Sequence, residues 1–149
     1  MAGVEDFNPS VESFGEEGKE DGQLSFPNSV VTDSKGNYYV SDSNNARISV
    51  WAPDLTYKRI FGLGSGETAL NLPHGIWMDD QDRLHVVDTV GQVVRVYDVA
   101  GDDVTFLYGF GAFGADEAQF NFPNDIILDG TGRLYVADRE NNRIQVWLY

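Results

Sequence analysis

The sequence predicts an all-β fold of the β-propeller type, and three observations lead to this prediction. A set of short strand-like segments occurs three times, with 46 and then 50 residues between Pro27, Pro73 and Pro123. Repeats of this length that are built from short strands are typical of propellers and related arrays. Within each copy the apolar residues follow strand patterns, and no capped stripe has the 3.6-residue period of a helix. We therefore expect little or no helix.

Each copy begins with two strands that are joined by a polar turn. The first strand is almost wholly apolar, as in residues 76–78 and 126–128. Such a run is typical of a strand that is covered on both faces, which places it innermost in a propeller. The turn combines aspartate with glycine, for example Asp129 and Gly132, and both residues favour hairpins. The second strand ends in an aspartate in all three copies: Asp42, Asp88 and Asp138.

The third and fourth strands of each copy are predicted to lie further from the axis. The third strand alternates apolar and polar residues, as in Ile48, Ser49 and Val50, which indicates a half-exposed strand. The fourth strand covers residues 57–61 and 104–108 in the first two copies and leads into a Phe-Gly pair. Glycine-rich acidic loops then lead to the next copy.

The same Phe-Gly pair occurs once more, at Phe14 and Gly15. Its position predicts that residues 7–13 form an outer strand without preceding partners, and Pro9 is compatible with such an edge strand. The last copy contains only the first three strands, so the strands total twelve, or three four-stranded blades. We assign residues 1–149 to one half-propeller. It has an N-terminal outer strand in 1–13 and repeats at about 14–60, 61–109 and 110–149.

Three blades are too few to close a ring, since propellers have about four to eight. The end blades would expose apolar faces, and exposed patches of this kind are interaction sites. We expect two chains to form a homodimer with six blades, in which the N-terminal strand of each chain completes the last blade of the other. The alternative is that the chain is a piece of a longer single-chain propeller.

The composition is that of a soluble acidic globular protein. Twenty-four acidic residues against ten basic residues give a formal net charge of −14, which repels nucleic acids and anionic membranes. The chain has no apolar run long enough to span a membrane, and cysteine is absent, which excludes disulfides and thiolate chemistry. We therefore expect no nucleic-acid or membrane partner. The compartment is not fixed, and a periplasmic or extracellular mature form stays open.

Two of the copies carry closely related motifs. The third copy has Tyr-Val-Ala-Asp at 135–138 and Asn-Asn-Arg-Ile-Gln-Val at 141–146, and the first copy is close to it. The second copy departs, with Val93 where the others have Arg47 and Arg143. Over about residues 14–149 the chain resembles the NHL-repeat family. That resemblance implies a six-bladed propeller but no single activity, since the same fold hosts binding proteins and enzymes.

A narrower resemblance concerns one histidine. Residues 72–77 and 137–145 are similar to the peptidyl-α-hydroxyglycine amidating lyases, whose histidines after the equivalent proline converge on an axial zinc. The matching positions here are Asn28, His74 and Asn124, and only one of them is a histidine. A catalytic zinc site uses about three protein ligands. We therefore expect no cofactor, and zinc or calcium bound through His74 is the alternative.

The starts of the inner strands are the candidate ligand-binding surface, because these strands line the axis of a propeller. Four residues lie at this axial mouth: Asn28, His74, Asn124 and Asp125. The residues that recur between copies are assigned structural roles, since periodic residues maintain the packing of repeats: Asp42, Asp88, Asp138, Arg47 and Arg143. Trp77 departs from the repeat and is expected to plug the axis or to contact a neighbouring blade.

The leading interpretation is a non-catalytic module that binds a protein, a peptide or a small ligand and closes its ring by self-association. No catalytic residue is assigned, and we regard an enzyme as the weaker hypothesis. The alternative is a metal-dependent lyase or hydrolase of the amidating-lyase type that uses His74. A purely structural half-propeller is a third possibility.

Overall fold

The computed structural model describes residues 8–149 and shows three antiparallel sheets. Sheet 1 contains β3 (Pro27–Thr32), β4 (Tyr38–Asp42), β5 (Arg47–Trp51) and β6 (Tyr57–Phe61). Sheet 2 contains β7 (Pro73–Met78), β8 (Arg83–Asp88), β9 (Val93–Asp98) and β10 (Thr105–Phe110). Sheet 3 contains β11 (Pro123–Leu128), β12 (Arg133–Asp138) and β13 (Arg143–Leu148). The prediction of an all-β chain of repeated sheets is confirmed.

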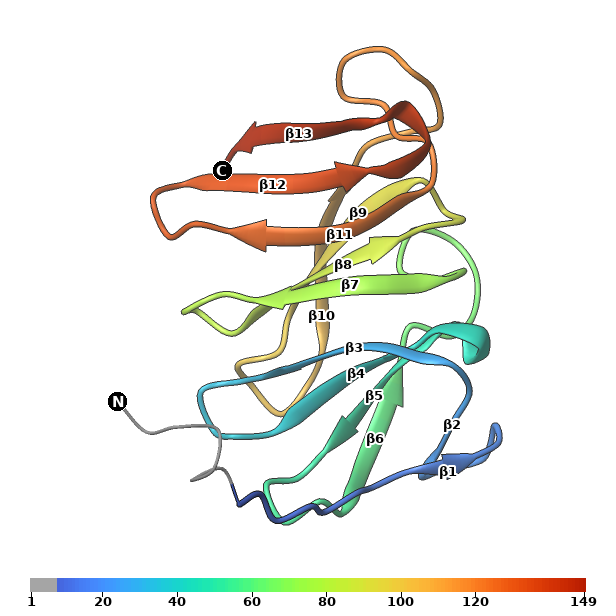
Figure 1. Cartoon of the computed structure of the whole chain (residues 1–149), viewed down its shortest axis with the longest axis vertical. Helices are drawn as coiled ribbons and strands as arrows, with labels where there is room; N and C mark the ends of the chain where they lie inside the picture. The colour runs from blue at the N-terminus through green and yellow to red at the C-terminus, as the bar shows by residue number, and fades with distance from the viewer. Residues whose placement is uncertain (1–7) are drawn as a thin grey trace.

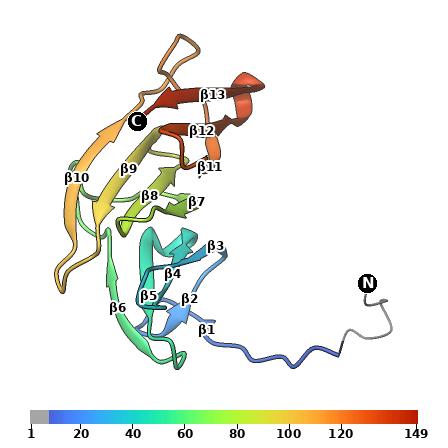
Figure 2. The same cartoon turned by 90° about the vertical axis from the view of Figure 1, so that its left-hand side faces the viewer.

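The sheets follow one another along the molecule in chain order. Figure 1 shows the first strands, β3, β7 and β11, side by side, with sheet 2 between the other two. In Figure 2 the last strands of sheets 1 and 2, β6 and β10, lie on the opposite side of the molecule. Within each sheet the strands pair in sequence order. This arrangement is that of neighbouring propeller blades, whose first strands are innermost.

The inner strand of each sheet is held by the same register. Its first residue, a proline, lies opposite the aspartate that ends the second strand, as in the pair Pro27 and Asp42. The equivalent pairs are Pro73 with Asp88 and Pro123 with Asp138. The register then shifts directly after the proline in all three sheets. Such irregularities bend the strand, so the residues after each proline are turned away from the regular ladder.

Two apolar cores lie between successive sheets. In the first core, Ile48 and Val50 of sheet 1 pack with Ile76, Leu84 and Val86 of sheet 2. In the second core, Val87 and Val94 of sheet 2 pack with Ile126, Leu134 and Val136 of sheet 3. We call the side of a sheet that faces the following sheet its trailing face, and the side that faces the preceding sheet its leading face. Each core therefore joins a trailing face to a leading face.

The structure differs from the expectation at the N-terminal end. Residues 8–13 form no strand, and Phe7, where the predicted strand begins, lies outside the described residues. A short parallel pair, β1 (Glu16–Glu17) with β2 (Gln23–Leu24), precedes sheet 1 instead. Short 3₁₀ turns, η2 (Ser43–Asn45) and η3 (Arg139–Asn141), connect the second and third strands of sheets 1 and 3. Pairing of residues 7–13 with a second chain stays a prediction.

Candidate functional site

His74 and Asn124 meet at the axial mouth. They lie on β7 and β11, each directly after the proline that begins its strand. Nδ1 of His74 is 2.9 Å from Oδ1 of Asn124. Because an amide oxygen can only accept, this contact places a donating proton on Nδ1. The mouth therefore presents one oriented imidazole.

A glycine allows β7 and β11 to approach one another here. A Cβ atom on Gly75 would lie 2.6 Å from Cα of Asp125 and 2.9 Å from the carbonyl oxygen of Asn124, so no larger residue fits without movement. Asp125 is exposed, and its Oδ1 accepts a hydrogen bond from the backbone N–H of Ile126 at 2.9 Å. Asn28 occupies the equivalent position on β3 and is also exposed. Of the four predicted residues, His74 and Asn124 are in direct contact.

These residues do not fit a metal centre within one chain. His74 is the only imidazole among the three equivalent positions, and the amide of Asn124 already engages its Nδ1. Among residues 8–149, no group of three or more histidine, aspartate or glutamate side chains could hold a metal ion. A catalytic zinc site needs about three such ligands. We therefore derive no metal-dependent step from this site.

The repeated aspartates join the start of each sheet to its second and third strands. Oδ1 of Asp42 accepts from the backbone N–H of Ser25 at 2.7 Å, and its Oδ2 accepts from Nε of Arg47 at 2.7 Å. Asp138 makes the matching contacts with the N–H of Asn121 at 2.8 Å and with Nε of Arg143 at 2.8 Å. Burial alone would raise the pKa of Asp138, but these hydrogen bonds outweigh it and lower the pKa.

In sheet 2 an arginine at a different position contacts the repeated aspartate. Val93 stands where the other sheets have arginine, and Asp88 is instead approached by Nη1 of Arg95, 3.4 Å from its Oδ2. Asp88 also accepts from the N–H groups of Asn71 and Leu72 at 3.0 and 2.9 Å. Arg95 lies two residues along the same strand, so its side chain is on the same face as Val93. Sequence reasoning missed this role, and the two-residue spacing was the available signal.

Two open faces lie at the ends of the row of sheets. On sheet 1 a hollow of about 360 Å³ is lined by Phe14, Leu24, Val30, Tyr38 and Val40 together with the start of β3. On sheet 3 a hollow of about 370 Å³ is lined by Asn124, Arg139, Asn142, Ile144 and their neighbours. The first hollow belongs to the leading face of sheet 1, and the second to the trailing face of sheet 3. Both are surfaces that sheet 2 covers at the equivalent internal positions.

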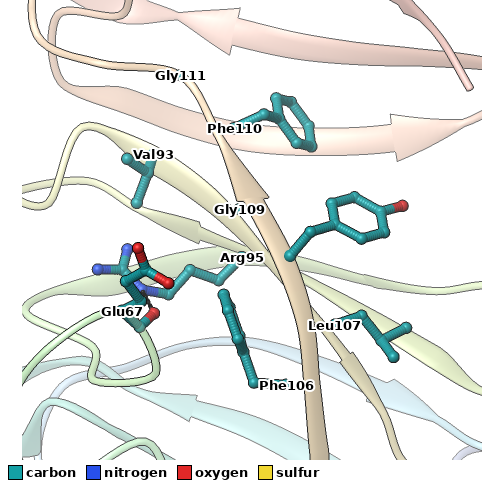
Figure 3. A pocket seen from close by; sticks show the side chains of 9 residues that line it. Glu67, Val93, Arg95, Phe106, Leu107, Gly109, Phe110 and Gly111 are labelled. Carbon is teal, nitrogen blue, oxygen red and sulfur yellow. Dashed lines mark hydrogen bonds between the residues drawn. The ribbon is translucent and has the colours of Figure 1, made fainter.

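A third hollow, of about 420 Å³, lies along the outer strand of sheet 2. Figure 3 shows Arg95 beside Glu67 on one flank, with Phe106, Leu107 and Phe110 projecting from β10. Nε of Arg95 donates to the carbonyl oxygen of Glu67 at 2.8 Å, so the guanidinium is anchored to the loop that leads into sheet 2. The sequence interpretation did not identify this hollow.

The remaining histidine and tryptophan of interest lie between sheets 2 and 3. His85 is fully buried, with Nδ1 3.2 Å from the carbonyl oxygen of Arg83 and its ring 5.3 Å from that of Tyr149. Burial lowers the pKa of His85, although the charge of Asp79 opposes this effect. Trp77 packs against the core between these two sheets. Of the two roles expected for Trp77, the contact with a neighbouring sheet is the one observed.

Comparison with known proteins identifies the repeats. A family model described as NHL repeat matches residues 24–51 and 120–147, so the resemblance to this family is confirmed for the first and third copies. The middle copy, with Val93 in place of arginine, lies outside both matches. No curated protein matches the sequence significantly. Within the described residues, no helix has the length and apolar character needed to cross a bilayer.

Two solved structures resemble the chain in fold. A structural genomics protein of unknown function from Bacteroides thetaiotaomicron superposes with a TM-score of 0.69 and 23% identity, over 87% of this chain and 37% of that chain. Streptogramin B lyase superposes with a TM-score of 0.61 and 15% identity, over 83% of this chain and 40% of the lyase. The chain therefore spans about two fifths of the length of either structure. At these identities the likeness concerns the fold alone.

Proposed function

We propose that this chain, which carries NHL repeats, is a non-catalytic binding and assembly module whose two end faces join those of a second copy to close a six-sheet ring. The observation that carries the proposal is the contrast between internal and terminal faces. Val94 and Val96 on sheet 2 are 0% exposed, whereas the equivalent Ile144 and Val146 on sheet 3 are 62% and 56% exposed. Ile144 and Val146 are as apolar as the core residues of sheet 2, but no sheet formed by residues 8–149 covers them.

The occupant of the trailing face of sheet 3 is indicated by the internal interfaces. Each trailing face within the chain packs against a leading face, and the leading face of sheet 1 is the one that no sheet of the described residues covers. Its Val30 is 56% exposed, whereas the equivalent Ile76 is 3% exposed. Covering one such side chain is worth roughly 1 kcal/mol or more. Two open faces of complementary type on one chain favour a second copy of that chain as the partner.

Polar contacts between the sheets extend the same pattern. Oγ of Ser43 donates to the carbonyl oxygen of Pro73 at 2.5 Å, and Oγ1 of Thr89 donates to that of Pro123 at 2.7 Å. The third residue in this series is Arg139, which lines the open hollow of sheet 3. The corresponding carbonyl is that of Pro27, which belongs to the open hollow of sheet 1. Ring closure would bring this donor and acceptor together.

A single polar contact between sheets 2 and 3 supports the same pairing. Oε1 of Gln92 accepts a hydrogen bond from the backbone N–H of Phe122 at 2.7 Å, across the boundary between sheets 2 and 3. Gln92 has a φ of +60°, and Asn142 takes the equivalent place on sheet 3 with a φ of +53°. The equivalent of Phe122 is Phe26, directly before β3. The amide of Asn142 is thus positioned to accept from the Phe26 N–H of a second copy.

The ligand-binding part of the proposal concerns the axial mouth. His74 and Asn124 form an oriented hydrogen-bonding pair there, and ring closure would surround the axis with six inner strands. A net charge of −14 for each chain favours a cationic or neutral partner, which fits a peptide, a protein loop or a small polar ligand. The three repeated aspartates already accept backbone and side-chain hydrogen bonds, which supports structural roles for them.

The proposal is tested by placing a charge on one end face. We expect Ile144→Asp to convert a dimer of about twice the chain mass into a folded monomer, because an aspartate in an apolar contact is strongly disfavoured. The matched control is Leu107→Asp, since Leu107 is exposed on β10 away from both end faces. Sedimentation equilibrium distinguishes the two variants. Equal masses for the wild type and Ile144→Asp would contradict the proposal.

A further inference from the structure

An aromatic pair at each sheet shows where the segment before sheet 1 belongs. Phe61 ends sheet 1 and packs on Tyr97 of sheet 2, with 5.2 Å between ring centroids. Phe110 ends sheet 2 and packs on Trp147 of sheet 3 at 4.6 Å. Phe14 packs on Trp51 of sheet 1 at 4.9 Å. Phe14 therefore occupies the place of the residue that ends the outer strand of a preceding sheet.

The glycine after each of these phenylalanines has the same conformation. Gly15, Gly62 and Gly111 have φ values of +87°, +97° and +96°, a region that favours glycine. A Cβ at each of these positions would lie within 2.6 Å of a side-chain atom of the apolar residue that precedes the next inner strand: Leu24, Leu70 and Phe120. The chain therefore enters the next sheet through the same glycine turn at all three places.

The outer edge of sheet 3 is the place where an additional strand would fit. β5 and β9 pair with strands on both sides, whereas β13 pairs only with β12 within the described residues. Residues 8–13 form no strand, and Val11 is 86% exposed. They lie at the opposite end of the molecule from β13 (Figure 1). The segment and the edge therefore come together between two chains.

We infer that residues 8–13 are an exchanged strand, which pairs antiparallel with β13 of a second copy and completes its third sheet. This inference rests on the proposed ring closure and adds the element that links the two copies. The internal sheets define the register, because Phe61 lies opposite Ile48 and Phe110 lies opposite Val94. Phe14 is therefore opposite Ile144 of the partner copy.

The remainder of the register follows from the irregularity that both outer strands share. Arg59 and Tyr108 lie two residues before these phenylalanines and face Val50 and Val96. By the same offset, Glu12 faces Val146 of the second copy. Tyr57 and Phe106, four residues before, face Trp51 and Tyr97 across the shift, so Ser10 faces Trp147. Pro9 lies on an outermost strand, where its missing N–H breaks no ladder.

The register is tested by disulfide trapping, for which the chain provides a clean background because it contains no cysteine. Glu12→Cys combined with Val146→Cys places two thiols at directly opposite positions, where Cβ atoms are about 5 Å apart. The matched control combines Ser13→Cys with Val146→Cys, because Ser13 lies outside the shift and its side chain points to the opposite face from that of Glu12. Both proteins are oxidised under mild conditions and analysed on a non-reducing gel. We expect a covalent dimer for the first pair and little for the control.

A deletion separates this inference from ring closure itself. Removal of residues 1–13 keeps both end faces, and we expect it to raise the dimer dissociation constant at least about tenfold through the loss of main-chain hydrogen bonds. A wild-type dimer with equal trapping of the two cysteine pairs would overturn the exchanged strand and leave ring closure intact. A wild type that is monomeric at all concentrations would overturn both.

Discussion

The hydroxyl of Tyr149 donates a hydrogen bond to Oδ2 of Asp79 over 2.6 Å and joins the end of sheet 3 to the first turn of sheet 2. In sheets 1 and 3 the equivalent aspartate accepts a hydrogen bond from a tyrosine of the same sheet. Tyr39 donates to Asp33 at 3.2 Å, and Tyr135 donates to Asp129 at 3.0 Å. Sheet 2 has His85 at that position, so the phenol comes from its neighbour. The guanidinium of Arg83 lies 4.9 Å from the Tyr149 ring centroid and completes the contact.

This contact predicts that Tyr149→Phe destabilises the protein. Loss of a hydrogen bond to a carboxylate should lower the free energy of unfolding by about 1–2 kcal/mol. The control is Tyr108→Phe, because Tyr108 is exposed on β10 and its substitution should stay within about 0.5 kcal/mol of the wild type. Urea denaturation followed by tryptophan fluorescence measures both. Equal stability of the two variants would show that the inter-sheet contact contributes nothing.

The two repeated arginines are predicted to differ in importance. The side chain of Arg47 is 5% exposed and also donates to the carbonyl oxygens of Lys19, Glu20 and Gln23. Arg47→Ala would leave the buried Asp42 without its cation, at a cost of about 3 kcal/mol. The side chain of Arg143 is 32% exposed, so Arg143→Ala should cost about 1 kcal/mol. Thermal and urea unfolding measure both costs, and the reverse order would contradict this assignment.

The burial of His85 leads us to expect that the protein loses stability in mild acid. Its pKa is lowered from 6.5 by burial, so the unfolded chain binds a proton at a pH where the folded chain does not. The free energy of unfolding should therefore fall as the pH drops below about 6.5, until the lowered pKa of the folded state is reached. The charged groups near the imidazole are Asp79, which favours protonation, and Arg83, which opposes it.

The variant that isolates this effect is His85→Phe, which cannot titrate. It should flatten the dependence of stability on pH between about 7 and 5, whatever its stability at pH 7. Tyr135→Phe alters the same repeat position in sheet 3, and it should keep the wild-type slope. Urea denaturation at a series of pH values provides the comparison. An unchanged slope in His85→Phe would assign the acid sensitivity to other groups.

The residues at the axial mouth lead to an expectation about the metal content of the purified protein. His74 has Asn124 as its neighbour, and asparagines occupy the other equivalent positions, so we expect neither zinc nor calcium in stoichiometric amount. Protein purified without added metal is analysed by mass spectrometry of the elements, and thermal unfolding is compared with and without EDTA. One zinc per chain that disappears in His74→Asn would favour the metal-dependent lyase or hydrolase instead.

The repeated residues made most of the fold predictable from sequence. Pro27 and its two equivalents mark the inner strands, and Asp42 and its equivalents mark the ends of the second strands, because each pair lies opposite in one register. The contacts that escaped prediction come from residues outside the repeat. Arg95 reaches Asp88 from two residues away, and Tyr149 reaches Asp79 from another sheet. Such contacts depend on how sheets pack, which local patterns do not encode.

The equivalence of His74 and Asn124 was predictable from the repeat, but their contact was not. The place of His74 after Pro73 indicated the axial mouth, because an inner strand begins there. Its pairing with Asn124 depends on the close approach at Gly75, where a Cβ would lie 2.6 Å from Cα of Asp125. The outer strand predicted for residues 7–13 rests on the Phe-Gly pair and the strand count, and residues 8–13 form no strand within the single chain. Its pairing with the last sheet of a second copy stays a prediction.

The mass of the unmodified protein in solution tests the central claim most directly. Sedimentation equilibrium over a range of concentrations should give twice the chain mass of 16.5 kDa, with dissociation only on dilution. A six-sheet ring of two chains predicts that value, since each copy covers the end faces of the other. A folded protein of 16.5 kDa at every concentration would contradict the account, because both end faces would then be stable in water.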